Sequence, residues 1–512
     1  MAILKNIRQH SLPHILPLLL LLTLPGAFGC SSRVSTEDIR TELAYGSYET
    51  LTEKMQAAHE AHEEFVTALN LARVLQLQGR WQESIEIYEA GLTLLEEYER
   101  RAIINMRELL GEAGSILISR GSLGYYGTGY ERTLLHTFNA MNYVMLGDFS
   151  GAAVEMRRME QRQEVWLAEE EYRLREYAEK RQSIGNPASY DDEPESLPGQ
   201  YSMAELLRDP QVRALANSYQ DPFSYSLSAI VCRLAGDEEY AGVSLRRAAL
   251  LDPAAGDMFS AAWGPGKGVA RQRANQTQGL PSYDNWTPNI PRRAKKASAA
   301  TQEVTVMIFS GLAPALNLEQ IRIPAPYIGY LMIDLPSYIG SVRGNAPTVE
   351  LLAPGKSASA ASPRSSAASA KHLAAHPLLR IELLAYRTLR DEVRYEIGSA
   401  IARAIFRAAT AGAAYAVARS NDDTQAFAGL IGLGVSAIMD LVASGTSSSV
   451  RNWELLPAAG FLSMGAVPRG SCLRVTLGAD EAEIDLPGEA EGIIVMISQI
   501  TTSKMRVDYV AY

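Results

Sequence analysis

Amphipathic helical patterns fill much of the first half of the chain, and strand-like patterns fill much of the second. Three segments of the first half share one arrangement: an apolar helical run, a glycine, and a second helical run that is amphipathic. A glycine permits the turn between two helices, and a small residue five positions later lets the helices pack closely. The pattern predicts three helical hairpins, with turn glycines Gly79, Gly147 and Gly236 and small residues Ser84, Ala152 and Ala241.

These three units resemble the tetratricopeptide repeat. The third unit has another small residue, Ala248, and Asp252-Pro253 at the end of its second helix, where a proline stops the helix. Gly79 and Gly147 are 68 positions apart, twice the repeat period of about 34 residues. Gly236 follows 89 positions later, which is not a multiple of that period. The resemblance implies a degenerate, interrupted array of stacked helix pairs.

Strand patterns begin at residue 303, with β-branched and aromatic runs bounded by glycine and proline. We expect the early and late runs to pair with each other across a helical insertion at 377–443, giving a small β-sandwich. The predicted fold class is therefore α+β: an N-terminal helical repeat domain followed by a small β-sandwich-like domain with an inserted helical hairpin. The predicted strands lie at 304–309, 327–333, 473–477, 482–486, 493–497 and 506–510.

Segments rich in proline, serine and charged residues suggest where the domains meet. A Ser/Ala/Pro stretch at 353–370 is too small and polar to pack, so it should be a mobile loop. The expected parts are a helical domain at 30–182, a linker at 183–202, a further repeat at 203–263, a linker at 264–300, and a β domain at 301–512.

The chain begins with a signal-like segment at 1–29. Lys5 and Arg8 precede an apolar run that is shorter than the roughly 20 residues needed to cross a bilayer. The following Ala-Phe-Gly-Cys, which ends at Cys30, resembles the lipobox of bacterial lipoproteins. The resemblance implies that Cys30 carries a diacylglyceryl thioether and an N-acyl chain. An ordinary secretory signal cut near Gly29, with Cys30 incidental, is the alternative.

Location follows from the same resemblance. Ser31 stands where an aspartate would resemble an inner-membrane retention signal, so we expect a lipid-anchored protein of the bacterial envelope, at the outer membrane and facing the periplasm. The chain has 48 basic and 58 acidic residues, a net charge of −10, which argues against nucleic acid as a partner. Removal of the leader would leave 46 basic residues and a charge near −12, so attachment to the membrane should depend on lipid.

No segment predicts a reaction. His59 and His62 are one helical turn apart among solvated acids, and His372 and His376 flank a low-complexity loop, so we expect neither pair to bind a metal. The other two cysteines, Cys232 and Cys472, lie in a predicted helix and a predicted strand and are expected to be buried free thiols. We therefore expect no catalytic residues, no metal and no cofactor, and a protein that is not an enzyme.

The glycine-rich segment 426–439 is the most unusual part of the sequence. Gly429, Gly432 and Gly434 would let two helices touch closely, either in a buried hairpin or within a membrane. We favour the buried hairpin because the segment is too short to span a bilayer.

Taken together, these features resemble a family of bacterial envelope lipoproteins with tetratricopeptide-like repeats. The matching segments are 130–149, 221–237 and 450–457, the last of which contains Arg451, Trp453, Leu456 and Pro457. The resemblance implies an architecture and a location, and it brings no catalytic residues. We expect Arg451 and Trp453 to form a structural joint between the hairpin and the sandwich.

The leading hypothesis is a scaffold whose concave repeat face binds a helix or extended segment of another envelope protein. The candidate anchors for that partner are Tyr125, Tyr126, Tyr130, His136 and Tyr143. Two alternatives remain. One is a cell-wall-binding module or envelope enzyme that uses the C-terminal β domain, and the other is a membrane-inserting component that acts through the glycine-rich hairpin.

Overall fold

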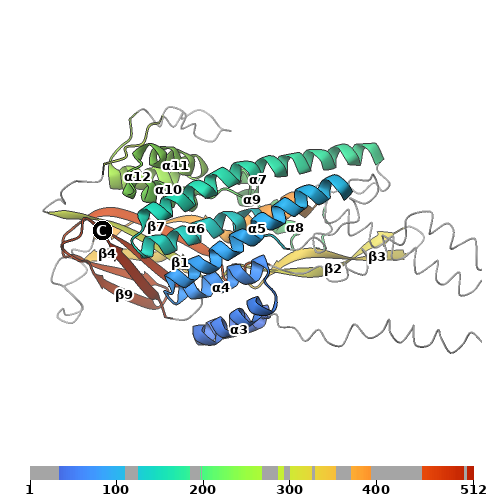
Figure 1. Ribbon diagram of the computed structural model, residues 1–512, viewed down its shortest axis with the longest axis horizontal. Helices are drawn as coiled ribbons and strands as arrows, with labels where there is room; N and C mark the ends of the chain where they lie inside the picture. Colours follow the sequence, from blue (N-terminus) through green and yellow to red (C-terminus); the bar gives the residue numbers. More distant parts are fainter. Residues whose placement is uncertain are drawn as a thin grey trace, which may run out of the picture.

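The computed structural model describes residues 34–109, 125–184, 197, 199–267, 286–292, 300–325, 329–352, 371–393, 452–500 and 504–512. Helices come first along the chain and β-sheets follow, so the fold class is α+β (Figure 1). The expected signal segment, Cys30, the loop 353–370, the glycine-rich segment 426–439 and Arg451 lie outside the described residues.

Most of the helices form consecutive antiparallel pairs. The three pairs expected from the sequence are α4–α5, α6–α7 and α10–α11. The named helices are α2 (Thr36–Tyr45), α3 (Tyr48–Ala61), α4 (Phe65–Leu77), α5 (Trp81–Leu109), α6 (Gly129–Met145), α7 (Phe149–Ile184), α8 (Ala204–Arg208), α9 (Pro210–Ala214), α10 (Pro222–Leu234), α11 (Glu238–Leu251) and α12 (Pro253–Trp263).

The three pairs turn in the same way. Gly79, Gly147 and Gly236 have φ angles of 76°, 77° and 87°, in the left-handed region that glycine adopts without strain. In each turn the residue after the glycine donates its N–H to the carbonyl five positions earlier, at 3.0, 2.9 and 2.8 Å respectively. The small residues five positions after the glycines are all buried, as close packing of each pair requires.

A five-stranded mixed sheet packs against the helices, in the order β11-β10-β1-β7-β6. Strand β1 is parallel to β10 and antiparallel to β7, so the expected pairing of the early run 304–309 with a late run is confirmed. The other early run, 327–333, overlaps a strand that pairs with residues 315–325 instead. Its strands are β1 (Thr301–Ser310), β6 (His376–Arg380), β7 (Ala459–Pro468), β10 (Gly492–Gln499) and β11 (Arg506–Ala511).

The remaining strands form a second sheet and a hairpin. The second sheet has the order β5-β4-β8-β9, with β4 (Pro347–Leu352), β5 (Lys371–Leu373), β8 (Cys472–Leu477) and β9 (Asp480–Asp485). The hairpin pairs β2 (Ala315–Ala325) with β3 (Gly329–Ile339) over eleven residues and extends beyond the two sheets (Figure 1).

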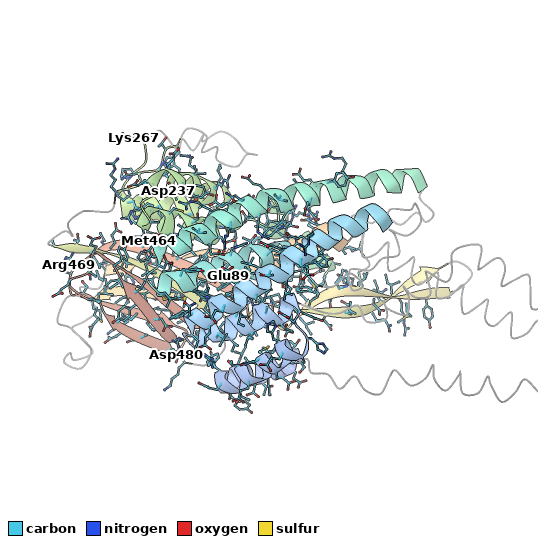
Figure 2. All side chains as sticks on the ribbon, in the orientation of Figure 1. Glu89, Asp237, Lys267, Met464, Arg469 and Asp480 are labelled. Carbon is cyan, nitrogen blue, oxygen red and sulfur yellow. The ribbon has the colours of Figure 1, made fainter. Side chains whose placement is uncertain are left out.

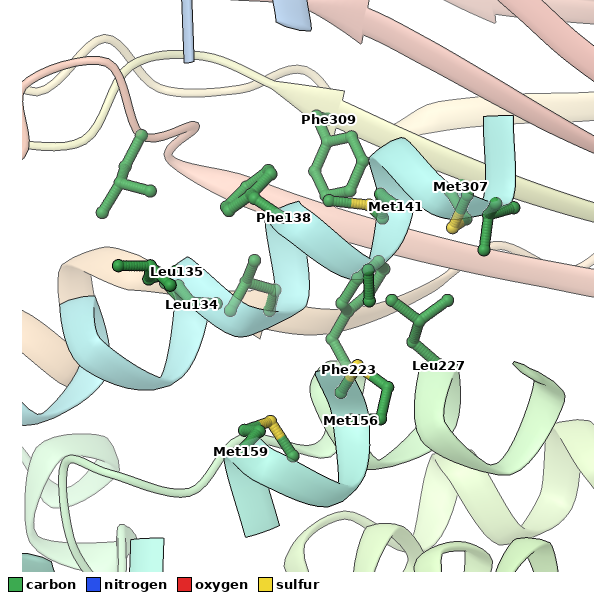
Figure 3. Packing of buried hydrophobic residues seen from close by; sticks show 14 of the residues in the cluster. Leu134, Leu135, Phe138, Met141, Met156, Met159, Phe223, Leu227, Met307 and Phe309 are labelled. Carbon is green, nitrogen blue, oxygen red and sulfur yellow. The ribbon is translucent and has the colours of Figure 1, made fainter. Parts of the chain in front are cut away.

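Side-chain alternation along β1 builds three layers. Met307 and Phe309 pack among the helices, whereas Val306 and Ile308 pack against the second sheet. Figure 3 shows Phe309 beside Phe138 of α6 and near Phe223 of α10. The helical repeats and the β region, expected as separate domains, therefore share one hydrophobic core.

Two expected boundaries are corrected. Residues 377–380 belong to β6, and the helical part of the insertion begins at residue 381 within the described residues. The expected linker 183–202 is partly packed: Leu197 and Tyr201 are buried against the β2–β3 hairpin, and the Tyr201 hydroxyl donates to the Pro336 carbonyl. The segment packs because its few apolar side chains are buried against the hairpin. Its polar overall composition gave no indication of this.

Candidate functional site

The first helix of each pair is enclosed on all sides. Nearly every residue of α4, α6 and α10 is buried. On one side each of these helices packs against the second helix of its pair, and on the other side lie the five-stranded sheet and the turn that precedes β7. The second helices, α5, α7 and α11, keep one exposed face. The face expected to bind a partner is thus covered by the chain's own C-terminal part.

The turn at 452–457 closes this face. Trp453 is 0% exposed, and its ring lies edge-on to Phe138 and Tyr88, with centroids 5.6 and 6.0 Å apart. The N–H groups of Glu454 and Leu455 donate to Oδ1 of Asn70 on α4, at 3.1 and 3.3 Å. A side chain of a first helix therefore forms hydrogen bonds with the backbone of this turn. A bound peptide would be held by contacts of the same kind. Trp453, the described residue of the two expected to form a structural joint, lies between the helix pairs and the five-stranded sheet.

Glu131 connects the turn to the start of α6. Its Oε1 accepts from the backbone N–H of Trp453 at 2.7 Å. Its Oε2 accepts from the N–H and hydroxyl of Thr128, at 2.7 and 2.9 Å, and from the Tyr125 hydroxyl. Thr128 and Glu131 form a capping box, which satisfies N–H groups that the first turn of a helix leaves free. Burial and the neighbouring carboxylate raise the pKa of Tyr125 well above its usual value.

A buried cation lies beside this joint. The Arg73 guanidinium is 4.3 Å from the centre of the Phe138 ring and donates to the Gln76 side chain. Burial lowers the pKa of Arg73 to about 10, so the group stays charged near neutral pH. Its Nε and Nη2 have no hydrogen-bond partner among the described residues.

Gln76 extends the contact to neighbouring helices. Its Nε2 donates to the Phe138 carbonyl at 2.8 Å and to Oδ1 of Asn142 at 2.7 Å, and Asn142 donates to Ser84 at 2.8 Å. Gln76 and Asn142 were not among the candidate residues expected from the sequence. The signal that could have found this region is the set of polar positions Asn70, Arg73 and Gln76, three apart in a mostly apolar helix.

Another buried carboxylate joins the second and third helix pairs. Glu160 of α7 accepts hydrogen bonds from Ser228, Ser244 and Arg247, at distances of 2.8–2.9 Å. Asp237, labelled in Figure 2 at the turn before α11, accepts from Arg157 of α7 at 2.5 Å. These contacts fix the third pair on the second despite the irregular spacing of their glycines.

The five candidate anchors do not share one exposed groove. Tyr130 and His136 are buried, and Nδ1 of His136 lies 2.9 Å from the carboxylate of buried Glu155. The expectation that these two contact a partner is corrected: they lie on α6, which the sheet and α7 cover. Tyr125, Tyr126 and Tyr143 are half-buried. Tyr126 stacks on Tyr98, with ring centroids 4.3 Å apart.

Two cysteines and one histidine outside this region are engaged or enclosed, whereas the His372 side chain is exposed. Cys232 and Cys472 are buried free thiols, as expected, and burial raises their pKa values to about 12 and about 11. Nδ1 of His59 lies 3.0 Å from the Thr67 hydroxyl. In the part of the chain that the structure describes, no group of three or more His, Cys, Asp or Glu residues could hold a metal ion.

Among the described helices, none is long and apolar enough to cross a membrane. Comparison of the chain with protein-family models, curated proteins and solved structures finds no match.

Proposed function

We propose that this protein is a lipid-anchored lipoprotein of the bacterial outer membrane that faces the periplasm and acts as a protein-binding scaffold. Its tetratricopeptide-like helix pairs pack against one face of the five-stranded sheet with their inner side, and they bind partners with their outer side. The observation that carries this proposal is the enclosure of α4, α6 and α10 by the sheet and Trp453, which leaves the second helices as the accessible side of the array.

The geometry of the three helix-pair turns supports the similarity to tetratricopeptide repeats. The three turns share a left-handed glycine, the same hydrogen bond to the carbonyl five positions before, and a buried small residue five positions after the glycine. Such a turn orients the second helix of a pair against the first.

An apolar stripe on α7 is the surface that we propose for the partner. Val154, Val165 and Tyr172 are 43, 56 and 60% exposed. Their spacings of 11 and 7 residues correspond to about three and two helical turns, so all three lie on one side of the helix. Arg158 and Gln161, also exposed, lie between them on that side. This arrangement fits the apolar face of a partner helix docked along α7.

Photo-crosslinking in intact envelopes tests the surface. A crosslinker at position 165 should give a discrete adduct that Val154→Glu and Tyr172→Glu reduce severalfold, because a charge within a desolvated contact is costly. A crosslinker at Leu250, an exposed position on α11, is the matched control. Equal adducts at positions 165 and 250, or adducts that survive both substitutions, would show that the α7 stripe is not the binding surface.

The anchor is tested separately. Cells that express the wild-type protein should incorporate a labelled fatty acid into it, and Cys30→Ala should abolish the incorporation. Equal labelling of the two proteins would contradict the lipid attachment.

A further inference from the structure

We infer that one face of the folded protein rests on the lipid surface: the start of α2 together with the turn at 339–343. This inference rests on the proposed lipid anchor and adds how the body is oriented on the membrane. The contacting surface is a bilayer interface, and the contact is apolar in character.

The distance from the anchor to the folded body is short. Helix α2 starts at a defined point, where the Ser35 hydroxyl accepts from the Asp38 N–H at 3.1 Å and the Asp38 carboxylate accepts from the Ser35 N–H at 3.3 Å. Four residues lie between Cys30 and Ser35, so the Cα atoms of these two residues are at most about 18 Å apart. Helix α7 alone, with 36 residues, is about 54 Å long. The side of the body that carries the start of α2 must therefore face the membrane.

Helix α2 is fixed to that body. Ile39 and Leu43 are buried in the main core. The Arg40 guanidinium lies against Gly340, in the space that a Cβ there would occupy. The turn that follows β3 is therefore the immediate neighbour of the helix nearest the anchor.

This turn exposes apolar side chains. Ile339 and Val342 are 51 and 38% exposed, and the adjacent Arg343 is exposed as well. The backbone of Val342 pairs with Leu312 through two hydrogen bonds of 2.9 and 3.0 Å, which hold the turn in place. Apolar side chains next to an arginine suit the boundary between headgroups and acyl chains.

Electrostatic attraction does not explain such a contact. Without the leader the chain has 46 basic and 58 acidic residues, a charge near −12, and the first turn of α2 contains Glu37 and Asp38. Anionic lipid would repel both acids. We therefore expect the contact to persist at high salt, because the lipid anchor and apolar burial maintain it.

Depth-dependent fluorescence quenching tests the inference. The lipidated Ile339→Cys protein is labelled with an environment-sensitive dye, since Cys232 and Cys472 are buried and the lipid thioether blocks Cys30. Tyr172→Cys on α7 is the matched control: it has a similar exposure, and α7 lies on the opposite side of the view from α3, the helix after α2 (Figure 1). Arg343→Cys provides a second probe of the turn.

In phosphatidylethanolamine and phosphatidylglycerol vesicles, quenching by lipids labelled near the headgroup should be at least about twofold stronger at position 339 than at position 172. Position 343 should behave like 339, and high salt should not change the result. Equal quenching at 339 and 172 in protein that floats with the vesicles would overturn this inference and leave the anchor intact. Loss of flotation in the wild type, or flotation that Cys30→Ala does not reduce, would instead reject the anchor and the inference with it.

Discussion

The backbone N–H of Trp453 donates a 2.7 Å hydrogen bond to Oε1 of Glu131, which lies 322 positions earlier in the chain. The other oxygen of the same carboxylate caps the first turn of α6. One buried side chain thus starts a helix of the array and holds the turn that closes the array's inner face. Loss of this carboxylate should loosen both parts together.

Glu131→Ala should lower the free energy of unfolding by about 2–4 kcal/mol, because the buried donors of Trp453 and Thr128 lose their acceptor. Glu86→Ala, at an exposed position on α5, should change it by less than about 0.5 kcal/mol. Urea denaturation followed by tryptophan fluorescence measures both. Equal stability of the two variants would mean that Glu131 does not support the joint.

Arg73 offers a test of a buried charge. Arg73→Met should leave the free energy of unfolding unchanged or raise it by about 1–4 kcal/mol, because an apolar chain of similar length removes the cost of burying the guanidinium. Gln76→Ala should lower it by about 1–3 kcal/mol, since the Phe138 carbonyl and the Asn142 amide lose their partner. A large loss of stability in Arg73→Met would show that the charge itself is needed.

Asp221 should make stability depend on pH. Burial raises its pKa from 3.8 to about 6 in the folded protein, against the opposing hydrogen bonds from Ser224. Between these values the folded state binds more protons than the unfolded state, so this contribution to stability is present below about pH 4 and is lost as the pH rises through about 6. Asn can also cap α10, so Asp221→Asn should keep the helix start and remove the titration.

Urea denaturation at pH 5 and pH 7.5 measures this effect. The wild type should gain about 1–1.5 kcal/mol more than Asp221→Asn when the pH is lowered from 7.5 to 5. The same pH dependence in both proteins would contradict the assignment to Asp221. Glu454, whose pKa burial also raises to about 6, contributes in the same direction in both proteins and cancels in the comparison.

Glycine substitutions should have opposite effects at two positions. Gly147→Ala should destabilise the protein by about 1–2 kcal/mol, since φ is 77° there and the nearest atom is at an ordinary 3.9 Å, so the cost lies in the backbone. Gly242→Ala, in the middle of α11 with 3.8 Å of clearance, should stabilise it by about 0.5–1 kcal/mol. Thermal unfolding reports both, and destabilisation of similar size at the two positions would count against the turn geometry.

Local patterns predicted much of the secondary structure. The turn glycines and the small residues after them act within a few positions of one another, and the β-branched and aromatic run at 304–309 reflects burial on both faces of a strand. Neither pattern contains information on which distant segment covers which face. The irregular spacing before Gly236 likewise concealed the contacts of Glu160 that join α7 to α10 and α11.

The candidate anchor residues show the consequence of not knowing which distant segment covers a helix. From the sequence, His136 and Tyr130 were aromatic positions on a helix expected to line a groove, and burial against α7 and the sheet makes them interior residues. Asn70, Arg73 and Gln76 are polar positions of a mostly apolar helix, and Asn70 and Gln76 bind partners more than 60 positions away.

The sequence alone was enough for the α+β class and the helix-pair turns, because these depend on local backbone preference and on the periodicity of apolar residues. Only the folded chain shows that the inner face of the array is closed by Trp453 and the sheet. The reason is physical: that closure depends on buried hydrogen bonds and aromatic contacts between residues hundreds of positions apart, whose energy exists only after both parts have folded.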